Sequence, residues 1–442
     1  LKTKGEKNML NIFKQKRKQL QEQPLQYWEE YSYIHALSRN DDKFLLTEEC
    51  IDRVRQLIDV KVIGYMLPVH EEGKPGVLFI EYKGEEYEFR FYYVEHEVSH
   101  LANFQRHFFL EKEMDEVQKV TMALSSYMKF GKDVRSSYIL QLKLLQALMP
   151  NTLAFEDESA EKLINRKWVE LAVNSKLPCD FKDLYTVQAV MASDTDIWIH
   201  THGLARCSIA ELEILHSSKS VYNHHYSIIS TLANMVLEEA YDEEKNYAII
   251  GQFINMNPII VRKISWTEGI LQYDSTVLGT ENDRKNSHNS KSEIIFIINE
   301  ENEISLLEEV NTLLANNPIF YISNAETLRM KNLALERFSY VRKVMAMNDK
   351  ENYTVLIKMG LITDHGEQSD NKEHIWFELL RMEDNILNLK LTQEPYDIAA
   401  LHEGDEGTYF LEEMTDWLLY TPFGRISPNM IYLLDINMDE EK

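Results

Sequence analysis

Apolar and polar residues alternate along residues 87–94, where four aromatic side chains, beginning at Tyr87, point to one face of an expected strand. Similar short runs, separated by turn residues, predict further strands elsewhere in the chain. We expect strands at residues 60–67, 76–82, 87–94, 152–155, 184–192, 197–200, 248–254, 258–261, 294–298, 319–322, 353–361, 373–382, 386–391, 407–411 and 430–434.

A spacing of three to four residues between apolar positions predicts helices between these strands. The clearest stripe runs from Ile139 to Leu148, and Pro150 ends it. Residues 279–292 contain no apolar side chain, so we expect a mobile surface loop there. The other expected helices occupy residues 44–59, 111–129, 208–215, 222–241, 305–315 and 325–347, with one more beginning at Ser159.

Strands and helices mixed in this way predict an α+β protein with mixed or antiparallel sheets flanked by helices. With 442 residues the chain is too long for one hydrophobic core, so several domains are expected. We divide it into a polar N-terminal helical segment (1–43), an N-terminal α+β domain (44–245), a middle α/β segment (246–323) and a C-terminal α+β domain (324–442).

The formal net charge of -25 disfavours binding to nucleic acid or to anionic lipid, because the average field repels phosphate groups. No apolar run approaches the roughly 20 residues of a membrane span, and no signal peptide is evident. Cys50, Cys179 and Cys207 are an odd number of widely spaced thiols, as is typical of a reducing compartment. We therefore expect a cytoplasmic protein that binds neither nucleic acid nor membranes.

The motif His96-Glu97-Val98-Ser99-His100 matches the zinc-protease pattern His-Glu-x-x-His. On a helix, histidines four residues apart share one face and can both bind Zn²⁺, while the glutamate polarises the attacking water. Here the motif begins within two residues of an expected strand end. Two interpretations stay open: a zinc site, or the favoured strand-to-helix junction whose histidines and glutamate face solvent.

A second pair of histidines, His200 and His202, ends the expected strand at residues 197–200 and precedes Gly203. Alternate residues of a strand share a face, so the two imidazoles can act together. They could hold a metal, form a hydrogen-bonded structural pair, or contribute to a ligand or partner site. The sequence names no third metal ligand, which favours the structural pair.

Four short motifs of the last 90 residues or so resemble the bacterial YegJ-like module, a domain-of-unknown-function family. The motifs are residues 373–378 (Glu-His-Ile-Trp-Phe-Glu), 393–395 (Gln-Glu-Pro), 401–405 (Leu-His-Glu-Gly-Asp) and 415–417 (Thr-Asp-Trp). Residues 198–204 with 211–213 are similar to an uncharacterised domain that precedes this module in longer bacterial proteins. The resemblance implies a bacterial cytosolic setting and no particular activity.

Within the C-terminal module, Trp376 and Trp417 are expected in the core, and Gly404 and Gly424 in turns with unusual backbone angles.

Our leading hypothesis is a non-catalytic protein that binds a protein partner or small molecule and needs no cofactor. The chain lacks a Gly-rich phosphate loop, a Gly-x-Ser-x-Gly elbow and a Cys-x-x-Cys pair. The predicted binding residues are Trp198, His200, His202, Arg206 and Glu211. The alternative is a zinc-dependent hydrolase that uses His96, Glu97 and His100.

Overall fold

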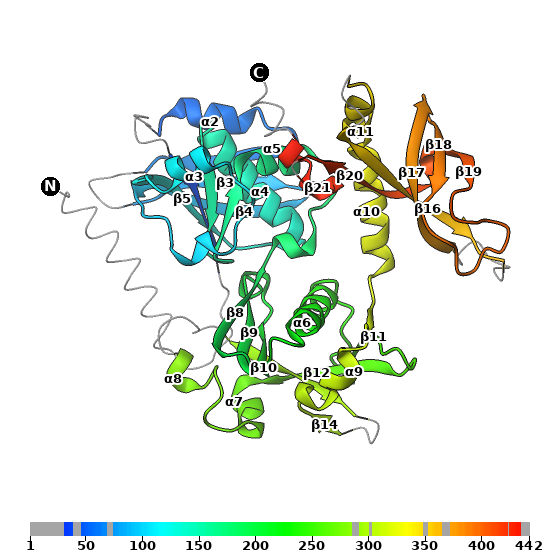
Figure 1. The fold of residues 1–442 in the computed structure, drawn as a ribbon. Coiled ribbons are helices and arrows are strands. Elements are labelled where there is room, and N and C mark those ends of the chain that lie inside the picture. The colour runs from blue at the N-terminus through cyan, green and yellow to red at the C-terminus, as the bar shows by residue number, and fades with distance from the viewer. Residues whose placement is uncertain are drawn as a thin grey trace. The chain divides into compact units, whose positions relative to one another are not determined.

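Three sheets and their helices make up the described part of the chain (Figure 1). The structure is a computed structural model that describes residues 31–38, 46–68, 74–284, 291–299, 303–347, 352–364, 372–422 and 424–434. One unit combines the residues up to Val173 with Cys179–Tyr321, and a second combines Asn174–Pro178 with the residues from Ile322 on. The prediction of a multi-domain α+β protein is confirmed.

The first sheet of the first unit pairs its strands antiparallel in the order β2-β3-β4-β5-β1-β6-β7. Helix α4 contacts β1 and β5 and is buried along most of its length. Its Gln141 amide nitrogen donates to the backbone oxygen of Ser32 and to the Ser126 hydroxyl, so both amide hydrogens are paired inside the core. The elements are β1 Ser32–Leu37, α2 Glu48–Arg55, β2 Val60–Met66, β3 Gly76–Tyr82, β4 Glu85–Glu95, η2 Leu101–Asn103, α3 Glu111–Val117, β5 Met122–Met128, α4 Val134–Leu148, β6 Ala154–Asp157, β7 Lys162–Asn165, α5 Arg166–Asn174 and η3 Phe181–Asp183.

The second sheet of the same unit follows the order β15-β11-β12-β13-β10-β9-β8, with β14 added beside β13. Strands β10 and β13 pair in parallel, and helix α6 contacts five strands of the sheet. The elements are β8 Thr186–Ser193, β9 Asp196–His202, η4 Ala205–Cys207, β10 Glu211–Ser217, α6 Tyr222–Leu237, β11 Ala248–Gln252, β12 Pro258–Ser265, α7 Trp266–Gly269, η5 Ile270–Gln272, α8 Glu281–Arg284, β13 Ser292–Ile298, β14 Ile304–Ser305, η6 Leu307–Val310, α9 Asn311–Leu314 and β15 Ile319–Phe320.

The second unit contains an antiparallel sheet in the order β19-β18-β17-β16-β20-β21, with helix α10 packed on β20. Trp417 of β20 is fully buried and donates its indole N–H to the backbone oxygen of Ala334 in α10 at 2.9 Å. Gly404 and Gly424 have φ angles of 91° and 123°, which confirms the expected turns. The elements are α10 Asn324–Glu336, α11 Phe338–Met345, β16 Thr354–Ile362, β17 Lys372–Glu383, β18 Ile386–Leu391, β19 Glu406–Phe410, η8 Leu411–Glu413, β20 Met414–Thr421, β21 Gly424–Ile426 and η9 Pro428–Met430.

Two regions that were predicted to be helical form strands in part. Residues 208–215 were expected to be helical but end in strand β10, which is buried on both faces. Glu211 and Glu213 alternate with Leu212 and Ile214, the period of a strand, but all four are buried, so no face of β10 is exposed. The expected helix at 111–129 stops at Val117, and its second half is strand β5, with Ser125 and Ser126 buried.

Four further expectations were wrong. Residues 305–315 form two short helical segments and not one helix. The strand expected at residues 430–434 is instead the end of η9 followed by a turn and three helical residues. Trp376 is only partly buried, because it lies on the face of β17 opposite the core residues Ile375 and Phe377. The predicted loop at 279–292 begins with helix α8, whose Arg284 is buried against Glu213 and Ser292, and its residues 285–290 lie outside the described part of the chain.

The N-terminal segment at residues 1–43 was expected to be helical, but its part Ser32–Leu37 is strand β1 between β5 and β6. Its remainder, apart from Tyr31 and Ser38, lies outside the described residues.

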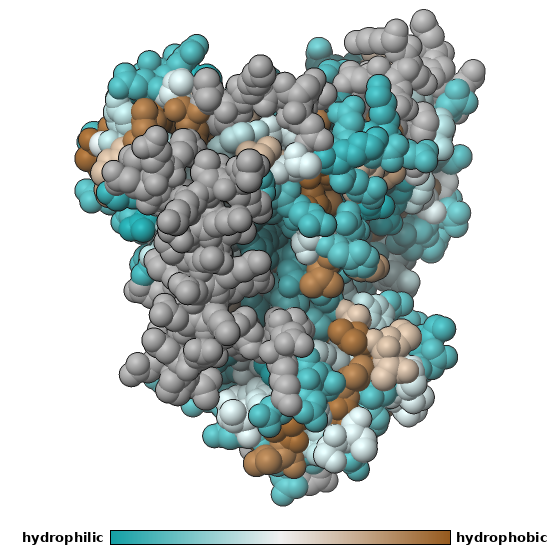
Figure 2. Space-filling view, turned by 90° about the vertical axis from the view of Figure 1, so that its left-hand side faces the viewer, coloured by the Kyte–Doolittle hydropathy of each residue, from teal (hydrophilic) through white to brown (hydrophobic). Residues whose placement is uncertain are grey.

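Hydrophilic residues cover much of the described surface on the face in Figure 2, and hydrophobic residues form small, separate groups there. Isolated apolar side chains are normal on protein surfaces, so we assign no interface to these groups. In the described ranges no helix is both long enough and apolar enough to span a membrane.

Replacing Trp417 by alanine should destabilise the second unit by about 3–5 kcal/mol, because the change leaves a large cavity and removes the hydrogen bond to the Ala334 oxygen. Hydrogen exchange of the full chain in urea, read on peptides from residues 354–421, measures the loss. Trp376→Ala is the matched control, and an equal loss in the two variants would contradict this role for Trp417.

Candidate functional site

The zinc-protease motif does not lie on a helix. Strand β4 ends at Glu95, residues 96–99 have no regular structure, and His100 precedes the short helix η2. His96 bonds through Nε2 to Glu156 at 2.6 Å, whereas the His100 ring packs on Phe104 with centroids 5.1 Å apart. The shared helical face on which a His-Glu-x-x-His zinc site depends is therefore missing at His96, Glu97 and His100. Elsewhere in the described ranges, no three His, Cys, Asp or Glu side chains are grouped to hold a metal.

The turn after His202 is held by one carboxylate. Glu211 accepts hydrogen bonds from the Thr201 hydroxyl at 2.6 Å and from the backbone N–H groups of Gly203 and Ala205 at 2.9 and 3.0 Å. Burial raises the pKa of Glu211, although these three donors act in the opposite direction. Glu211 therefore fixes the path from β9 into η4 and back into β10.

Arg206, in the same turn, joins the two sheets of the first unit. It is 3% exposed and donates to both carboxylate oxygens of Asp157 in β6, at 2.7 and 2.9 Å. It also donates to the Ser32 hydroxyl of β1 and to the backbone oxygen of Leu184. Burial alone would lower the Arg206 pKa, but the Asp157 carboxylate outweighs it and the pKa is raised. Both charges are paired, as buried charges in proteins usually are.

Trp198, His200 and His202 form a row of contacting rings along β9, tilted in the first pair and edge-to-face in the second, with centroids 4.3 and 4.9 Å apart. Trp198 donates its indole N–H to Glu213 at 3.0 Å, and His202 lies 3.8 Å from a carboxylate oxygen of Glu161. Burial lowers the pKa of His202 to about 4. The structure therefore brings the five predicted site residues into one turn region, but it directs most of them inward.

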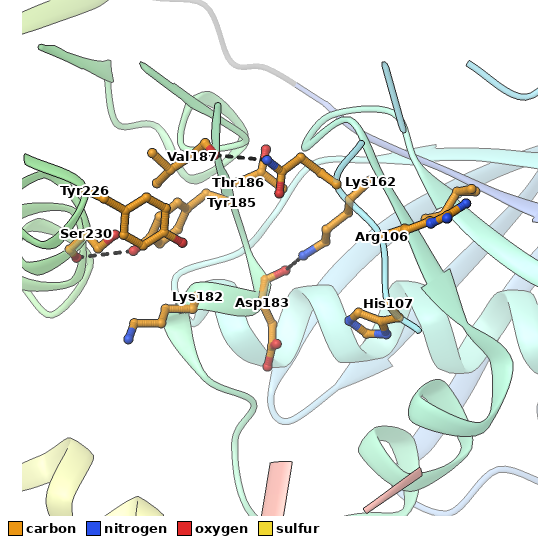
Figure 3. A pocket seen from close by; sticks show the side chains of 12 residues that line it. Arg106, His107, Lys162, Lys182, Asp183, Tyr185, Thr186, Val187, Tyr226 and Ser230 are labelled. Atoms are coloured by element: carbon orange, nitrogen blue, oxygen red, sulfur yellow. Dashed lines mark hydrogen bonds between the residues drawn. The ribbon is translucent and has the colours of Figure 1, made fainter. Parts of the chain in front are cut away.

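A cavity of about 190 Å³ adjoins this region, on the side of Thr186, the residue of β8 that pairs with His202 (Figure 3). It is formed by the segment before α3, strand β7, helix η3, the start of β8 and helix α6. The lining residues are Gln105, Arg106, His107, Lys162, Leu163, Lys182, Asp183, Tyr185, Thr186, Val187, Tyr226 and Ser230.

Backbone hydrogen bonds hold residues 105–107, the segment before α3, against strand β7. The Leu163 N–H donates to the Gln105 oxygen at 3.0 Å and the His107 N–H donates to the Leu163 oxygen at 2.9 Å, so residues 105–107 extend the sheet beyond β7. The Gln105 side chain then donates to the Val187 oxygen of β8 at 3.2 Å. Arg106 between them is left exposed at the cavity.

Lys162 is the buried cation of this cavity. It is 7% exposed, and its ammonium group donates to the backbone oxygen of Asp183 (Figure 3). Burial lowers the pKa of Lys162, although Asp157 and Asp183 act in the opposite direction. Burial, with a smaller effect of Lys162, also lowers the pKa of His107 to about 3, so this imidazole is neutral at physiological pH. Arg106 and Lys182 add two exposed cations at the cavity.

This cavity could not be predicted from a motif, because its cations come from three separate segments of the chain. No signal pointed to Lys162: we expected a helix from Ser159 on, whereas Lys162 is the first residue of the short buried strand β7. A second cavity of about 220 Å³ mixes signs, with Glu113, Glu116 and Glu170 beside Arg166 and Lys167. Only the first of these two cavities has an excess of cations.

The fold and this cavity define a multi-domain α+β protein with a cation-lined site in its first unit. More particularly, residues 32–179 match the family model for the N-terminal part of a protein of unknown function (DUF4026), and residues 187–296 match the model for its C-terminal part. Residues 324–426 match an uncharacterized protein conserved in bacteria (DUF2314). The chain is thus similar to domains of unknown function along most of its length, as the sequence motifs indicated. No curated protein and no solved structure gave a match.

Gly203→Ala should destabilise the first unit by more than about 3 kcal/mol. Its φ of 112° is unfavourable for alanine, and the added Cβ would lie 2.5 Å from the Leu184 oxygen. Gly84→Ala is the control, because its φ of 84° is also positive but its Cβ would meet nothing within 4 Å. Urea unfolding separates the steric loss at Gly203 from the loss of about 1 kcal/mol expected at Gly84, and similar losses would argue against a crowded turn.

His202→Gln should make stability less sensitive to acid. The His202 pKa is about 4 in the folded protein, against the ordinary histidine value of 6.5 that we assign to the unfolded chain. Between pH 4 and pH 6.5 the unfolded chain therefore binds a proton that the folded chain does not. Stability is therefore lost as the pH falls through this window. The difference in unfolding free energy between about pH 7 and pH 5 should shrink by about 1–2 kcal/mol in the variant. The exposed His100→Gln is the control, and an unchanged difference for His202→Gln would refute the assignment.

Proposed function

We propose that this chain is a non-catalytic binding protein whose first unit holds a small anionic ligand in the cavity beside β7 and β8. The observation that carries the proposal is the cluster of Arg106, Lys162 and Lys182 around one cavity, in a chain with a net charge of -25. An excess of cations in such a cavity concentrates small anions locally. The predicted site residues Trp198, His200, His202, Arg206 and Glu211 then support the site from inside.

Solvent accessibility also favours the cavity as the binding site over the histidine turn, by which we mean residues 200–206 at the end of β9. Trp198, His200 and Arg206 are 2–3% exposed, and Arg206 already bonds to Asp157, so an incoming ligand would have to displace internal contacts. Arg106 and Lys182 are exposed at the cavity and need no such displacement. A small ligand is favoured over a protein partner, because the charges surround a hollow and not a flat surface.

A non-catalytic role is supported by the burial of an arrangement that resembles a nucleophile with its base. His35 bonds to the Ser125 hydroxyl at 2.8 Å and to Glu158 at 2.9 Å, which reproduces the connections of a Ser-His-acid triad. Ser125, however, is 2% exposed in the middle of the first sheet, where no substrate carbonyl could reach it. Burial would lower the His35 pKa, but the bond to Glu158 outweighs it and the pKa is raised, as in a structural ion pair.

The setting that we propose is the bacterial cytoplasm, with the last domain related to the YegJ-like module. Its support is the acidic composition, the motifs at residues 373–417, and three buried cysteines that form no disulfide with one another. No described contact adds weight to a zinc hydrolase at His96, Glu97 and His100, so we do not propose it as a second function.

Titration calorimetry of the full chain with inorganic phosphate, succinate and acetate tests the proposal. At least one of these anions should bind, and Arg106→Ala and Lys182→Ala should each weaken it by about threefold to tenfold, because each removes one cation from the site. Both side chains are exposed, so the variants should fold. Lys112→Ala, which removes an exposed charge from α3 outside the cavity, should change the Kd by less than about twofold. The proposed function would be ruled out if none of the three anions bound, or if Arg106→Ala and Lys182→Ala bound them with the same affinity as the parent chain.

A further inference from the structure

We propose that the group bound in this cavity is a tetrahedral dianion, namely phosphate, free or as a small phosphate monoester, with the Lys162 ammonium as its buried partner. This inference rests on the proposed function and specifies its ligand. The charge balance, the directions of the cations and the volume of the cavity each support it.

The charge balance favours a dianion. Arg106, Lys162 and Lys182 face one carboxylate, Asp183, which leaves an excess of two positive charges. The Asp183 carboxylate is already engaged, because it accepts the backbone N–H of Asp180 at 2.9 Å in the cap of η3. His107 adds no charge, since its pKa is about 3. A monoanion would leave part of the positive excess of this cavity uncompensated.

The directions of the cations favour a tetrahedral group over a planar one. Arg106 comes from the segment that extends β7, Lys162 from β7 itself and Lys182 from η3. In Figure 3 the Lys162 ammonium points to Asp183, and the Arg106 and Lys182 side chains extend to opposite sides of it. A carboxylate presents two oxygens in one plane and is best met by a single arginine fork. A phosphate group presents three or four oxygens in different directions and accepts lysines as point charges.

The volume limits the size of the ligand. About 190 Å³ corresponds to roughly six water molecules at about 30 Å³ each, which is below the range of about 300–1,000 Å³ for drug-sized ligands. Phosphate with a few carbon atoms fits this space. Tyr226, 43% exposed beside the cavity, offers a ring face to those carbons.

The buried amine adds a pH signature. A bound dianion favours the charged form of Lys162, whose pKa burial lowers in the free protein. Affinity for a phosphate monoester should therefore rise as the ligand loses its second proton near pH 6, and fall in the alkaline range as the free Lys162 loses its own.

The experiment is calorimetry of the full chain with glycerol 3-phosphate, inorganic phosphate, succinate and acetate, at about 50 mM ionic strength, where screening is moderate. One or both phosphates should bind at least about tenfold more tightly than either carboxylate, and Lys162→Met should remove at least about tenfold of that affinity. Tighter binding of the ester identifies a phosphate monoester as the natural form, and equal or tighter binding of inorganic phosphate identifies the free anion. Lys112→Ala is again the matched control.

The pH profile keeps the test decisive should Lys162→Met fail to fold, because it needs only the parent chain and Lys182→Ala. Both should lose glycerol 3-phosphate affinity in the alkaline range. Equal or tighter binding of succinate or acetate, or a folded Lys162→Met with unchanged affinity, would overturn the phosphate assignment and leave the anion-binding function standing. Absence of binding by every anion would remove the function itself.

Discussion

The buried ion pair between Arg206 and Asp157 is the contact on which the first unit depends. It links the turn after β9, in the second sheet, to β6, in the first, with both side chains almost inaccessible to solvent. A pair of this kind contributes little net stability relative to apolar residues of the same size, but loss of one partner leaves an uncompensated charge, at a cost of about 3–5 kcal/mol. Its effect is therefore on geometry: the two sheets can pack only where the guanidinium meets the carboxylate. The added bonds to Ser32 and to the Leu184 oxygen fix the same position from two further segments.

That geometry also creates the cavity. Leu184 directly follows η3 and Asp157 lies five residues before Lys162, so the ion pair sets the spacing between the elements that carry Lys182 and Lys162. Asp157 acts on both cations, because it raises the pKa of Arg206 and opposes the lowering of the Lys162 pKa by burial. One carboxylate cannot neutralise two buried cations. The positive charge of Lys162 is therefore not fully neutralised. The described hydrogen-bond partner of its ammonium group at the cavity is the backbone oxygen of Asp183.

The sequence predicted those parts of the fold in which local pattern and tertiary environment agree. The meander β2-β3-β4, helices α4 and α6 and the buried Trp417 follow from periodicity, because each has one face toward a core. Prediction failed where burial is complete or the partner is distant. Strand β10 is buried on both faces, one of which carries Glu211 and Glu213, and Arg284 becomes a core residue only because Glu213 lies opposite it. The histidine turn was found as a polar cluster, but its inward orientation is set by Asp157 and Glu213, which a local motif does not contain.

An acidic chain with a cationic cavity discriminates between anions by size. At physiological ionic strength the field of the surface carboxylates is screened over about 8 Å, so a small anion that enters the cavity experiences mainly Arg106, Lys162 and Lys182. A polyanion such as nucleic acid would extend beyond the cavity and meet the repulsion of the remaining surface charge. The net charge that disfavours nucleic-acid binding is therefore compatible with phosphate binding, and it restricts the ligand to a molecule that fits within the reach of three side chains.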